Sequence, residues 1–315
     1  MVKPRIEDKL IKHDEELVAL DLKSGQVPPS ILYQNVVEWV HKACALALDA
    51  EKEGMSKQEI RGFFHNARSI HGRSEWIKRL QTWPRGYPGD FETIEMLMQG
   101  VAAPDLSTVA GCCEFYALNC PASQQHRNKI QIQSDLIRRS IDKGNIFSIA
   151  CGGCIDIENA LQGYRGANGA SGGVFINDLD RDAIEFATGR LESAEIHHQV
   201  IEGNIIRALS NRALENISLI IAGGLFDYLN DKNIGKIIHK GFHDILQRGG
   251  NFVFTNINKM NPYRPWIEYL ANWELIERSA DEIEAIVKSG NIPDDAISYK
   301  TDPTGMALVF TLTKA

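Results

Sequence analysis

The stretch Ile146–Leu161, "IFSIACGGCIDIENAL", joins an apolar run to a turn of small residues and then to a segment with helical spacing. The run up to Ala150 is apolar except for one serine, which is typical of a buried strand. Cys-Gly-Gly-Cys follows, and apolar residues then recur at helical intervals. We therefore predict a strand, a tight turn and a helix, and we ask whether Cys151 and Cys154 form a redox or metal pair or a turn that receives a ligand.

The sequence from Asn145 to the end alternates short apolar runs with helical patterns. The strand candidates are "IFSIA", "GVFIND", "HHQVIEG", "ISLIIAG" and "GNFVFTNI". Such a series predicts a mostly parallel sheet with helices on both faces. Two further strand-like runs flank Asp302-Pro303-Thr304-Gly305, which is a hairpin signal. The predicted fold class is therefore α/β, Rossmann-like, with an antiparallel hairpin at the C-terminal end, over residues 145–315.

Residues 1–144 show helical patterns and few strand signals. Apolar side chains at four-residue intervals follow Pro28 and Pro29 and predict one buried stripe on a helix. The members of this stripe are Leu32, Val36, Val40 and Cys44. A capping segment at Ser56 predicts a second helix, and a later helix is predicted to begin at Ser123 and to end at Gly144. We interpret this region as a helical cap or lid.

The composition limits the function classes. The chain has 315 residues, 43% hydrophobic and 24% charged, with a formal net charge of −7. It contains no basic block of the kind that nucleic-acid binding requires and no apolar run long enough to span a bilayer. Its N-terminus lacks the pattern of a secretory signal. We therefore expect a cytoplasmic protein that acts on a small molecule, with neither nucleic acid nor membrane as a partner, and the sequence leaves a homodimer open.

Metal and disulfide sites are weakly indicated. Six cysteines in a chain of this size are expected to be buried thiols, and Cys112, Cys113 and Cys120 have no matching ligand spacing downstream. His239 and His243 are four residues apart on a predicted helix, but no third ligand accompanies them. We predict no catalytic metal.

The residues that follow the predicted strands are the candidates for ligand binding, because ligands of doubly wound sheets bind at the carboxyl ends of the strands. Small residues around Gly152 allow backbone N–H groups to approach a polar ligand. Asp178 follows the second strand, where a carboxylate can accept both hydrogen bonds from a ribose diol. Asn204 follows the third strand and could offer its amide to an adenine edge. These positions favour a nucleotide-like ligand.

Each signal also has a structural interpretation. A glycine pair after a strand is most often only a turn, and an acid there is most often a helix cap, as Asp180 could be. The turn has neither a complete G-x-G-x-x-G nor a G-K-[ST], which argues against a hydride-transfer enzyme and a P-loop. Taken alone, the glycine turn therefore leaves several ligands open.

The ordered strand ends together with the closing hairpin resemble the class I S-adenosylmethionine-dependent methyltransferase superfamily, over about Ile146–Lys314. The resemblance implies that Ala150–Cys154 packs on the methionine part of the cofactor, that Asp178 holds the ribose, and that Ala222–Leu225 lines the sulfonium side. The predicted cofactor-binding residues are Ala150, Cys151, Gly152, Asp178, Leu179, Asn204, Ala222, Gly223, Leu225 and Arg127. The turn departs from the usual pattern, since Ala150 and Cys154 replace two of three glycines.

A narrower resemblance extends upstream of the sheet. "RGYPGDFETIEMLMQG", "CPASQQHRNKIQIQ", "IACGG", "AGGLFDYLNDK" and "KTDPTG" are similar to the bacterial group of extracellular-factor (3-hydroxy fatty acid methyl ester) biosynthesis proteins. The sequence is also similar to azetidine-2-carboxylate synthases, in which the methionine α-amine attacks its own γ-carbon and methylthioadenosine leaves. The resemblance implies an S-adenosylmethionine-using enzyme of secondary or signalling metabolism, and it leaves methyl transfer and cyclisation open.

Both reactions need positioning, a dry pocket and aromatic contact with the sulfonium charge. Tyr87 lies in a Pro-Gly turn and Tyr228 lies just past a strand, so both are candidates, although aromatic residues most often pack in cores. Asp90 could meet an amine or a hydroxyl. Asn128 could hold a carboxylate beside Arg127, although a solvated helix face is equally consistent with both. The predicted catalytic residues are thus Tyr87, Asp90, Asn128 and Tyr228. A methyltransferase-like protein that binds without catalysis is the remaining alternative.

Overall fold

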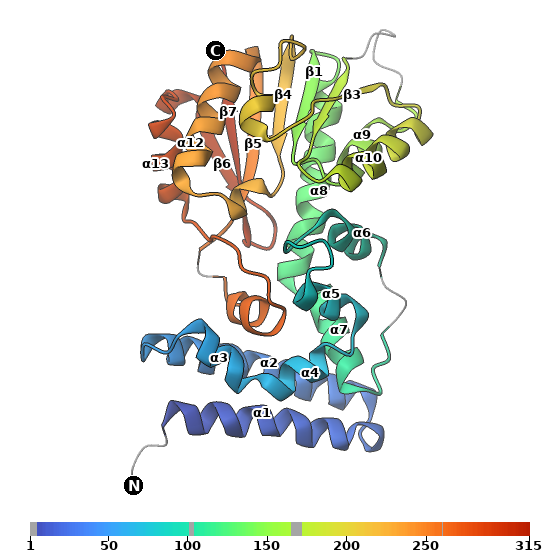
Figure 1. Ribbon diagram of the computed structural model, residues 1–315, viewed down its shortest axis with the longest axis vertical. Coiled ribbons are helices and arrows are strands. Elements are labelled where there is room, and N and C mark those ends of the chain that lie inside the picture. Colours follow the sequence, from blue (N-terminus) through green and yellow to red (C-terminus); the bar gives the residue numbers. More distant parts are fainter. Residues whose placement is uncertain (1–4, 101–103, 165–171, 260) are drawn as a thin grey trace. The chain divides into compact units, whose positions relative to one another are not determined.

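Figure 1 shows the computed structural model, which describes residues 5–100, 104–164, 172–259 and 261–315. The chain forms two compact units. One consists of Met1–Gln124 and Met260–Glu274, and the other of Gln125–Lys259 and Leu275–Ala315. The predicted division after residue 144 stays a prediction, because compactness alone does not test which parts fold independently. No described helix is long and apolar enough to cross a membrane.

The first unit is helical throughout its described residues. Its elements are α1 (Ile6–Leu22), η1 (Ser24–Gln26), α2 (Pro29–Lys52), α3 (Lys57–Phe63), α4 (His65–His71), α5 (Glu75–Thr82), α6 (Phe91–Gln99), α7 (Val109–Asn119) and the short helical turn η4 (Trp266–Leu270). The predicted apolar stripe of α2 is buried along its whole length, from Leu32 to Cys44. Ser56 and Glu59 form the predicted capping box at the start of α3.

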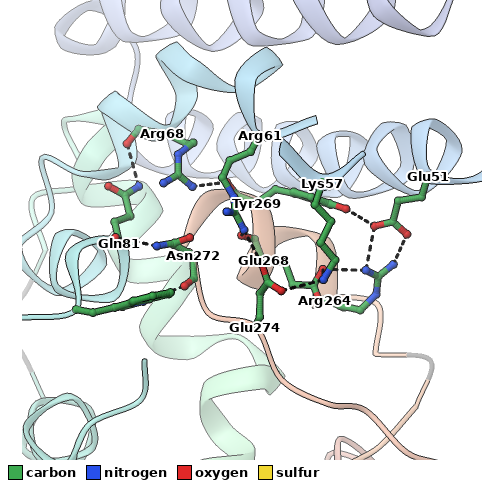
Figure 2. Close-up of polar contacts among 11 residues, drawn as sticks. Glu51, Lys57, Arg61, Arg68, Gln81, Arg264, Glu268, Tyr269, Asn272 and Glu274 are labelled. Carbon is green, nitrogen blue, oxygen red and sulfur yellow. Dashed lines mark hydrogen bonds and ion pairs between the residues drawn. The ribbon is translucent and has the colours of Figure 1, made fainter. Parts of the chain in front are cut away.

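The segment Met260–Glu274, which comes from between two strands of the sheet, belongs to the first unit. Figure 2 shows its anchoring network, which consists of Glu51, Lys57, Arg61, Arg264, Glu268, Tyr269 and Glu274. Arg264 donates to both carboxylate oxygens of Glu51, at 2.9 and 2.6 Å. Backbone carbonyls of the segment also accept hydrogen bonds, that of Tyr269 from Arg68 and that of Leu270 from Gln81. These bonds hold a long connection in place through side chains distant in sequence.

The second unit contains a seven-stranded sheet with the order β3-β2-β1-β4-β5-β7-β6. The strands are β1 (Asn145–Ile149), β2 (Val174–Asn177), β3 (His198–Val200), β4 (Ile217–Ala222), β5 (Leu246–Ile257), β6 (Ile297–Thr301) and β7 (Ala307–Thr313). The first five are parallel, and β7 pairs antiparallel with β5 and β6. This topology confirms the predicted Rossmann-like class I methyltransferase sheet with its C-terminal antiparallel hairpin.

Helices cover both faces of this sheet (Figure 1). Apolar residues of α8, α9 and α10 form one core with the sheet, and those of α11, α12 and α13 form the other. The bounds are α8 (Pro121–Ser140), α9 (Ile155–Leu161), α10 (Arg181–Ser193), α11 (Ile205–Ala208), α12 (Asp231–Lys240) and α13 (Ala280–Ser289), with short helical turns at η2 (Leu225–Tyr228), η3 (Gly241–Ile245) and η5 (Asp294–Ala296). The sheet is thus buried on both sides, and its carboxyl edge is left to bind ligands.

The helix α8 differs from the prediction at both ends. It begins at Pro121 rather than at Ser123, because proline is favourable in the first turn, and Ser123 instead donates its hydroxyl to the carbonyl of Ala117. It ends at Ser140, four residues before Gly144. The backbone N–H of Asn145 then bonds to Asn216 at 2.8 Å, so the chain enters β1 directly after a short turn.

Candidate active site

The turn after β1 has an unusual backbone. Ala150, Gly152 and Cys154 have φ values of 50°, 53° and 58°, in the left-handed region that favours glycine. Two of the three are not glycine, so the turn is strained, and such strain occurs often at ligand sites. The N–H of Cys151 bonds to the carbonyl of Asn177, which ties the turn to the end of β2. The turn therefore presents backbone N–H groups at the carboxyl edge of the sheet.

Asp178 accepts a hydrogen bond from one of these N–H groups. Its Oδ2 accepts a hydrogen bond from Gly152 N–H at 3.0 Å, and its Oδ1 accepts one from Asp180 N–H at 3.0 Å. Burial raises the pKa of Asp178, and the hydrogen bonds from Asp180 and Gly152 oppose that shift. A carboxylate has about four lone-pair positions. Two backbone donors thus fix its orientation while it can still accept two further donors, such as a diol.

Two asparagines shape the ends of β2 and β3. Asn177 is buried and donates its side-chain amide to the carbonyls of Ile201 and Gly203, at 2.7 and 2.9 Å. Asn204 is the N-cap of α11, where its Oδ1 accepts from Arg207 N–H. Leu179, directly after Asp178, is 77% exposed. An apolar side chain this exposed beside a fixed carboxylate could pack on a flat ligand.

The end of β4 continues into η2. Ala222 is buried as the last residue of the strand, and Leu225 packs against the core. Arg278, itself buried, donates to the carbonyls of Phe226 and Leu229 at 2.9 and 2.6 Å. It also donates to Asn256 at the end of β5. Arg278 therefore holds the backbone of η2 in one position relative to the sheet.

One face of α8 carries buried polar side chains toward the same edge. A Cβ atom added to Gly223 would lie 2.5 Å from Oε1 of Gln133, so the glycine lets this amide lie directly on the end of β4. One helical turn earlier, Nζ of Lys129 lies 3.9 Å from Oδ2 of Asp227 in η2. Lys129 and Asp227 are 4% and 3% exposed. A buried amine and carboxylate side by side are able to exchange a proton with a ligand.

Burial disfavours the charged form of both partners of this pair. It lowers the pKa of Lys129, although Asp227 and Asp302 oppose that shift. It raises the pKa of Asp227, against the opposing effect of Lys129, the Ile257 N–H and Arg278. Burial, followed by the charges of Lys129 and Arg127, also lowers the pKa of His126 well below its usual value. Burial therefore favours the neutral forms of these groups more than water does.

The predicted residues Arg127 and Asn128 lie on α8 next to Lys129. Asn128 donates its amide to Asp302 at 2.8 Å, in the turn between β6 and β7. Burial would raise the pKa of Asp302, but hydrogen bonds from Asn128, Ala307 and Thr304 outweigh it and lower the pKa. Asn128 thus fixes the hairpin turn, and its predicted catalytic role stays a prediction. Arg127 is half-buried.

The two tyrosines and Asp90 are divided between the units. Tyr87 and Asp90 belong to the first unit, whereas Tyr228 lies in η2 of the second. Tyr87 and Tyr228 are 38% and 40% exposed. Asp90 is the N-cap of α6, accepting from Thr93 N–H at 2.9 Å, and forms a 2.8 Å ion pair with Arg79. Asp90 therefore stabilises the start of a helix, and its catalytic role stays a prediction.

No disulfide joins the two cysteines of the turn. Cys151 and Cys154 are free thiols, the first half-buried and the second buried. In the described part of the chain, no group of three histidine, cysteine or acidic side chains could hold a metal ion. His239 bonds instead to the carbonyl of Gly290. The segment is thus a strand-to-helix turn that contains two thiols.

The sequence interpretation did not identify Lys129, Gln133 and Arg278. Gln125, Lys129 and Gln133 are spaced four residues apart in α8, so they share one face. A polar stripe of this kind is usually solvated, and the sheet packed against it shows that it is buried. Ile137 lies four residues after Gln133 on the same face, and its apolar side chain is the signal in the sequence that this face is buried.

Comparisons with known proteins agree with the fold. No protein-family model and no curated protein matches the sequence. A solved structure described as a possible exported protein from Bordetella parapertussis is 16% identical, with a TM-score of 0.55 over 93% of this chain and 99% of that chain. This likeness shows the fold alone.

Two further solved structures are methyltransferases. One is an S-adenosylmethionine-dependent methyltransferase from Clostridium acetobutylicum, 11% identical, with a TM-score of 0.44 over 64% of this chain and 97% of that chain. The other is human N-acetylserotonin methyltransferase in complex with S-adenosylmethionine, 14% identical, with a TM-score of 0.42 over 81% of this chain and 70% of that chain.

Proposed function

We propose that the protein is an S-adenosylmethionine-using enzyme that transfers a methyl group to a small molecule. The observation that carries the proposal is the contact between Gly152 N–H and the Asp178 carboxylate, at the carboxyl edge of a class I methyltransferase sheet. The contact fixes a carboxylate beside a turn of small residues. A nucleoside with a charged tail suits both features.

The residues present fit this cofactor. Asp178 would accept hydrogen bonds from the ribose hydroxyls with the lone pairs that Gly152 and Asp180 leave available. Leu179 would pack on the adenine, and the amide of Asn204 would lie near its edge. The turn from Ala150 to Cys154 would lie against the amino-acid end. When bound, the cofactor supplies an electrophilic methyl group on a sulfonium.

The chain's own residues would position the acceptor and take up a proton. Tyr228 would place its ring near the sulfonium charge. Lys129 would accept the proton that a hydroxyl or an amine loses on methylation, because burial favours its neutral amine form. Asp227, whose Oδ2 lies 3.9 Å from Nζ, would lie beside the ammonium group that results. Tyr87, Asp90, Asn128 and Arg127 remain candidates for contact with the acceptor. Helices around the site would exclude water.

We further propose a place in secondary or signalling metabolism, in the cytoplasm, with a small molecule as the partner and neither nucleic acid nor membrane. This part of the proposal is supported by the sequence resemblance and by the net charge of −7. A homodimer remains part of the proposal and is tested by measuring the molar mass in solution.

Calorimetry tests the cofactor. We expect the protein to bind S-adenosylmethionine and S-adenosylhomocysteine, and to bind them less tightly after Asp178→Ala. Absence of binding by the wild-type protein would contradict the proposal. Binding without turnover on any acceptor tested would favour the alternative of a protein that binds the cofactor without catalysis.

Cyclisation of S-adenosylmethionine to azetidine-2-carboxylate is the second candidate. The buried Lys129–Asp227 pair favours it, because cyclisation requires the α-ammonium group to lose a proton before the nitrogen attacks the γ-carbon. The test is incubation of the protein with S-adenosylmethionine alone, followed by mass spectrometry. Methylthioadenosine above a protein-free control supports cyclisation, and unreacted S-adenosylmethionine contradicts it.

A further inference from the structure

Cys151 and Cys154 are the first and last residues of a four-residue turn. The N–H of Cys154 bonds to the carbonyl of Cys151 at 3.1 Å. A β-turn closed in this way keeps its terminal Cα atoms within about 7 Å. Disulfides span Cα separations of about 4.4–6.8 Å. The backbone of the turn is therefore compatible with a bond between the two sulfurs.

Both thiols of the turn are free. The thiol of Cys151 donates to the carbonyl of Gly152, with a sulfur–oxygen distance of 3.6 Å. Cys151 is half-buried and can be reached by a small reagent, whereas Cys154 is buried behind it. The other cysteines, Cys44, Cys112, Cys113 and Cys120, are buried and belong to the first unit. Cys151 thus differs from the remaining thiols in exposure, and the pair differs from the other four cysteines in location.

We propose that Cys151 and Cys154 are a reversible modification site, which a small disulfide such as oxidised glutathione converts into an intramolecular disulfide that weakens cofactor binding. The second part of this inference rests on the proposed function. It would explain why thiols stand at two positions of a turn where small size alone is needed.

The reaction is a double thiol–disulfide exchange. The Cys151 thiolate attacks one sulfur of oxidised glutathione, the S–S bond breaks, and one glutathione thiolate leaves. The Cys154 thiolate then attacks the Cys151 sulfur of this mixed disulfide, and the second glutathione leaves. The protons lost by the two cysteines go to the two glutathione thiolates. The two cysteines are oxidised and one glutathione disulfide is reduced.

The two thiols differ in reactivity. The hydrogen bond with Cys151, burial and the charge of Asp156 raise the pKa of Cys154 well above its usual value, and the charge of Arg190 opposes them. Cys154 is therefore a protonated thiol at neutral pH, and Cys151 reacts first. The buried partner reacts only after the mixed disulfide has formed.

The disulfide would act on the cofactor through Gly152, which lies between the two cysteines. Gly152 holds the Asp178 carboxylate through its N–H, and Arg190 donates to the carbonyl of Gly153. A bond between the sulfurs fixes their separation at about 2 Å. The N–H that orients Asp178 would move with the turn.

Oxidised glutathione and peptide mapping test the modification. The wild-type protein is incubated with oxidised or reduced glutathione, alkylated and digested. We expect the peptide that carries both cysteines to lose two hydrogens and to resist alkylation, and dithiothreitol to restore it. A stable glutathione adduct on Cys151 without this loss, or no reaction, would overturn the inference.

S-adenosylhomocysteine is the probe for the effect on binding. We expect its affinity to fall roughly tenfold or more on oxidation and to recover with dithiothreitol. The readout is the ratio of reduced to oxidised affinity within each protein, so the starting affinity of a variant does not matter. Cys151→Ser should bring the ratio close to one, because Cys154 is buried and protonated and does not attack oxidised glutathione, and the matched control Cys112→Ser should keep the wild-type ratio.

The outcomes separate the two proposals. Reduced wild-type protein that does not bind S-adenosylhomocysteine contradicts the proposed function. Reduced protein that binds, together with a mapped disulfide that leaves the affinity unchanged, overturns the redox inference alone. Since mapping uses the wild-type chain, the inference stays testable even if Cys151→Ser fails to fold.

Discussion

The Nζ atom of Lys129 lies 3.9 Å from Oδ2 of Asp227, and both side chains are almost completely buried. The other carboxylate oxygen of Asp227 accepts the N–H of Ile257 at 2.6 Å. The pair thus connects a helix that precedes the sheet with the turn after its central strand. Removing one partner should affect the other strongly, because a buried charge without a partner is costly.

Lys129→Met is expected to lower the free energy of unfolding by about 3–5 kcal/mol at neutral pH, measured by urea denaturation. Without the ammonium group, the raised pKa of Asp227 should rise further. A carboxyl whose folded pKa exceeds its unfolded value stabilises the fold at low pH and loses that contribution as the pH rises through the folded pKa. The variant should therefore be closest to the wild type in acid.

The double variant Lys129→Met with Asp227→Asn is the matched control, because it removes both charges. We expect it to be more stable at neutral pH than Lys129→Met alone and to lose most of the pH dependence. Equal stability of Lys129→Met and the double variant at neutral pH would contradict the expectation that the unpaired, buried carboxylate of Asp227 destabilises the single variant.

Asp178→Ala is expected to weaken S-adenosylhomocysteine binding roughly ten- to hundredfold, the range that corresponds to losing hydrogen bonds to a charged group. Glu185→Ala, an exposed acid on α10, is the control and should bind normally. The assay is isothermal titration calorimetry. Equal affinity for both variants would exclude Asp178 from the ribose site.

The same carboxyl predicts a pH dependence of binding. Burial raises the pKa of Asp178, and the protonated form accepts hydrogen bonds less well. The affinity of the wild type should therefore fall as the pH is lowered from neutrality toward this raised pKa. The dependence should be reduced in Asp178→Asn, which keeps the shape and does not titrate.

Arg278→Lys should destabilise the second unit by about 2–4 kcal/mol, because one ammonium cannot reach all the acceptors of the guanidinium and leaves buried carbonyls without a donor. Since η2 would lose its support, S-adenosylhomocysteine affinity should also fall. Thermal unfolding and calorimetry measure the two effects. Arg212→Lys, at an exposed position, should change neither.

Arg264→Met should lower stability by about 1–2 kcal/mol, a value limited by the partial exposure of the pair with Glu51. Burial alone would raise the pKa of Glu51, but hydrogen bonds from Arg264 and Tyr269 lower it. A carboxyl group whose pKa is lower in the folded than in the unfolded protein stabilises the fold above the unfolded pKa. This stabilisation is lost as the pH falls through the folded pKa. The wild type should lose this stabilisation in acid, and the variant should have less to lose.

The centre of the sheet could be predicted because its strands contain apolar runs bounded by Gly, Asp or Asn. The parallel strands β1, β2, β4 and β5 are buried on both faces, and such strands give runs of this kind. The hairpin was also predictable, since Asp302 begins a turn whose residues favour it. Local sequence is sufficient where local structure is decided by burial and turn chemistry.

The rest of the site depends on contacts between distant residues. Lys129 has the sequence context of a solvated helix face, and only its approach to Asp227 shows that it is buried. Asp90 lies beside a Pro-Gly turn in the sequence, and only the structure shows that its carboxylate contacts Thr93 and Arg79. The partners of a polar side chain decide its role, and the sequence does not reveal those partners.

The segment Met260–Glu274 has a consequence for how the protein is made. The first unit includes residues from both early and late parts of the chain, and Arg264 and Tyr269 supply donors to Glu51. During translation the N-terminal helices leave the ribosome well before this segment, at about 5–20 residues per second. The N-terminal helices therefore remain incompletely packed until most of the sheet has also been synthesised.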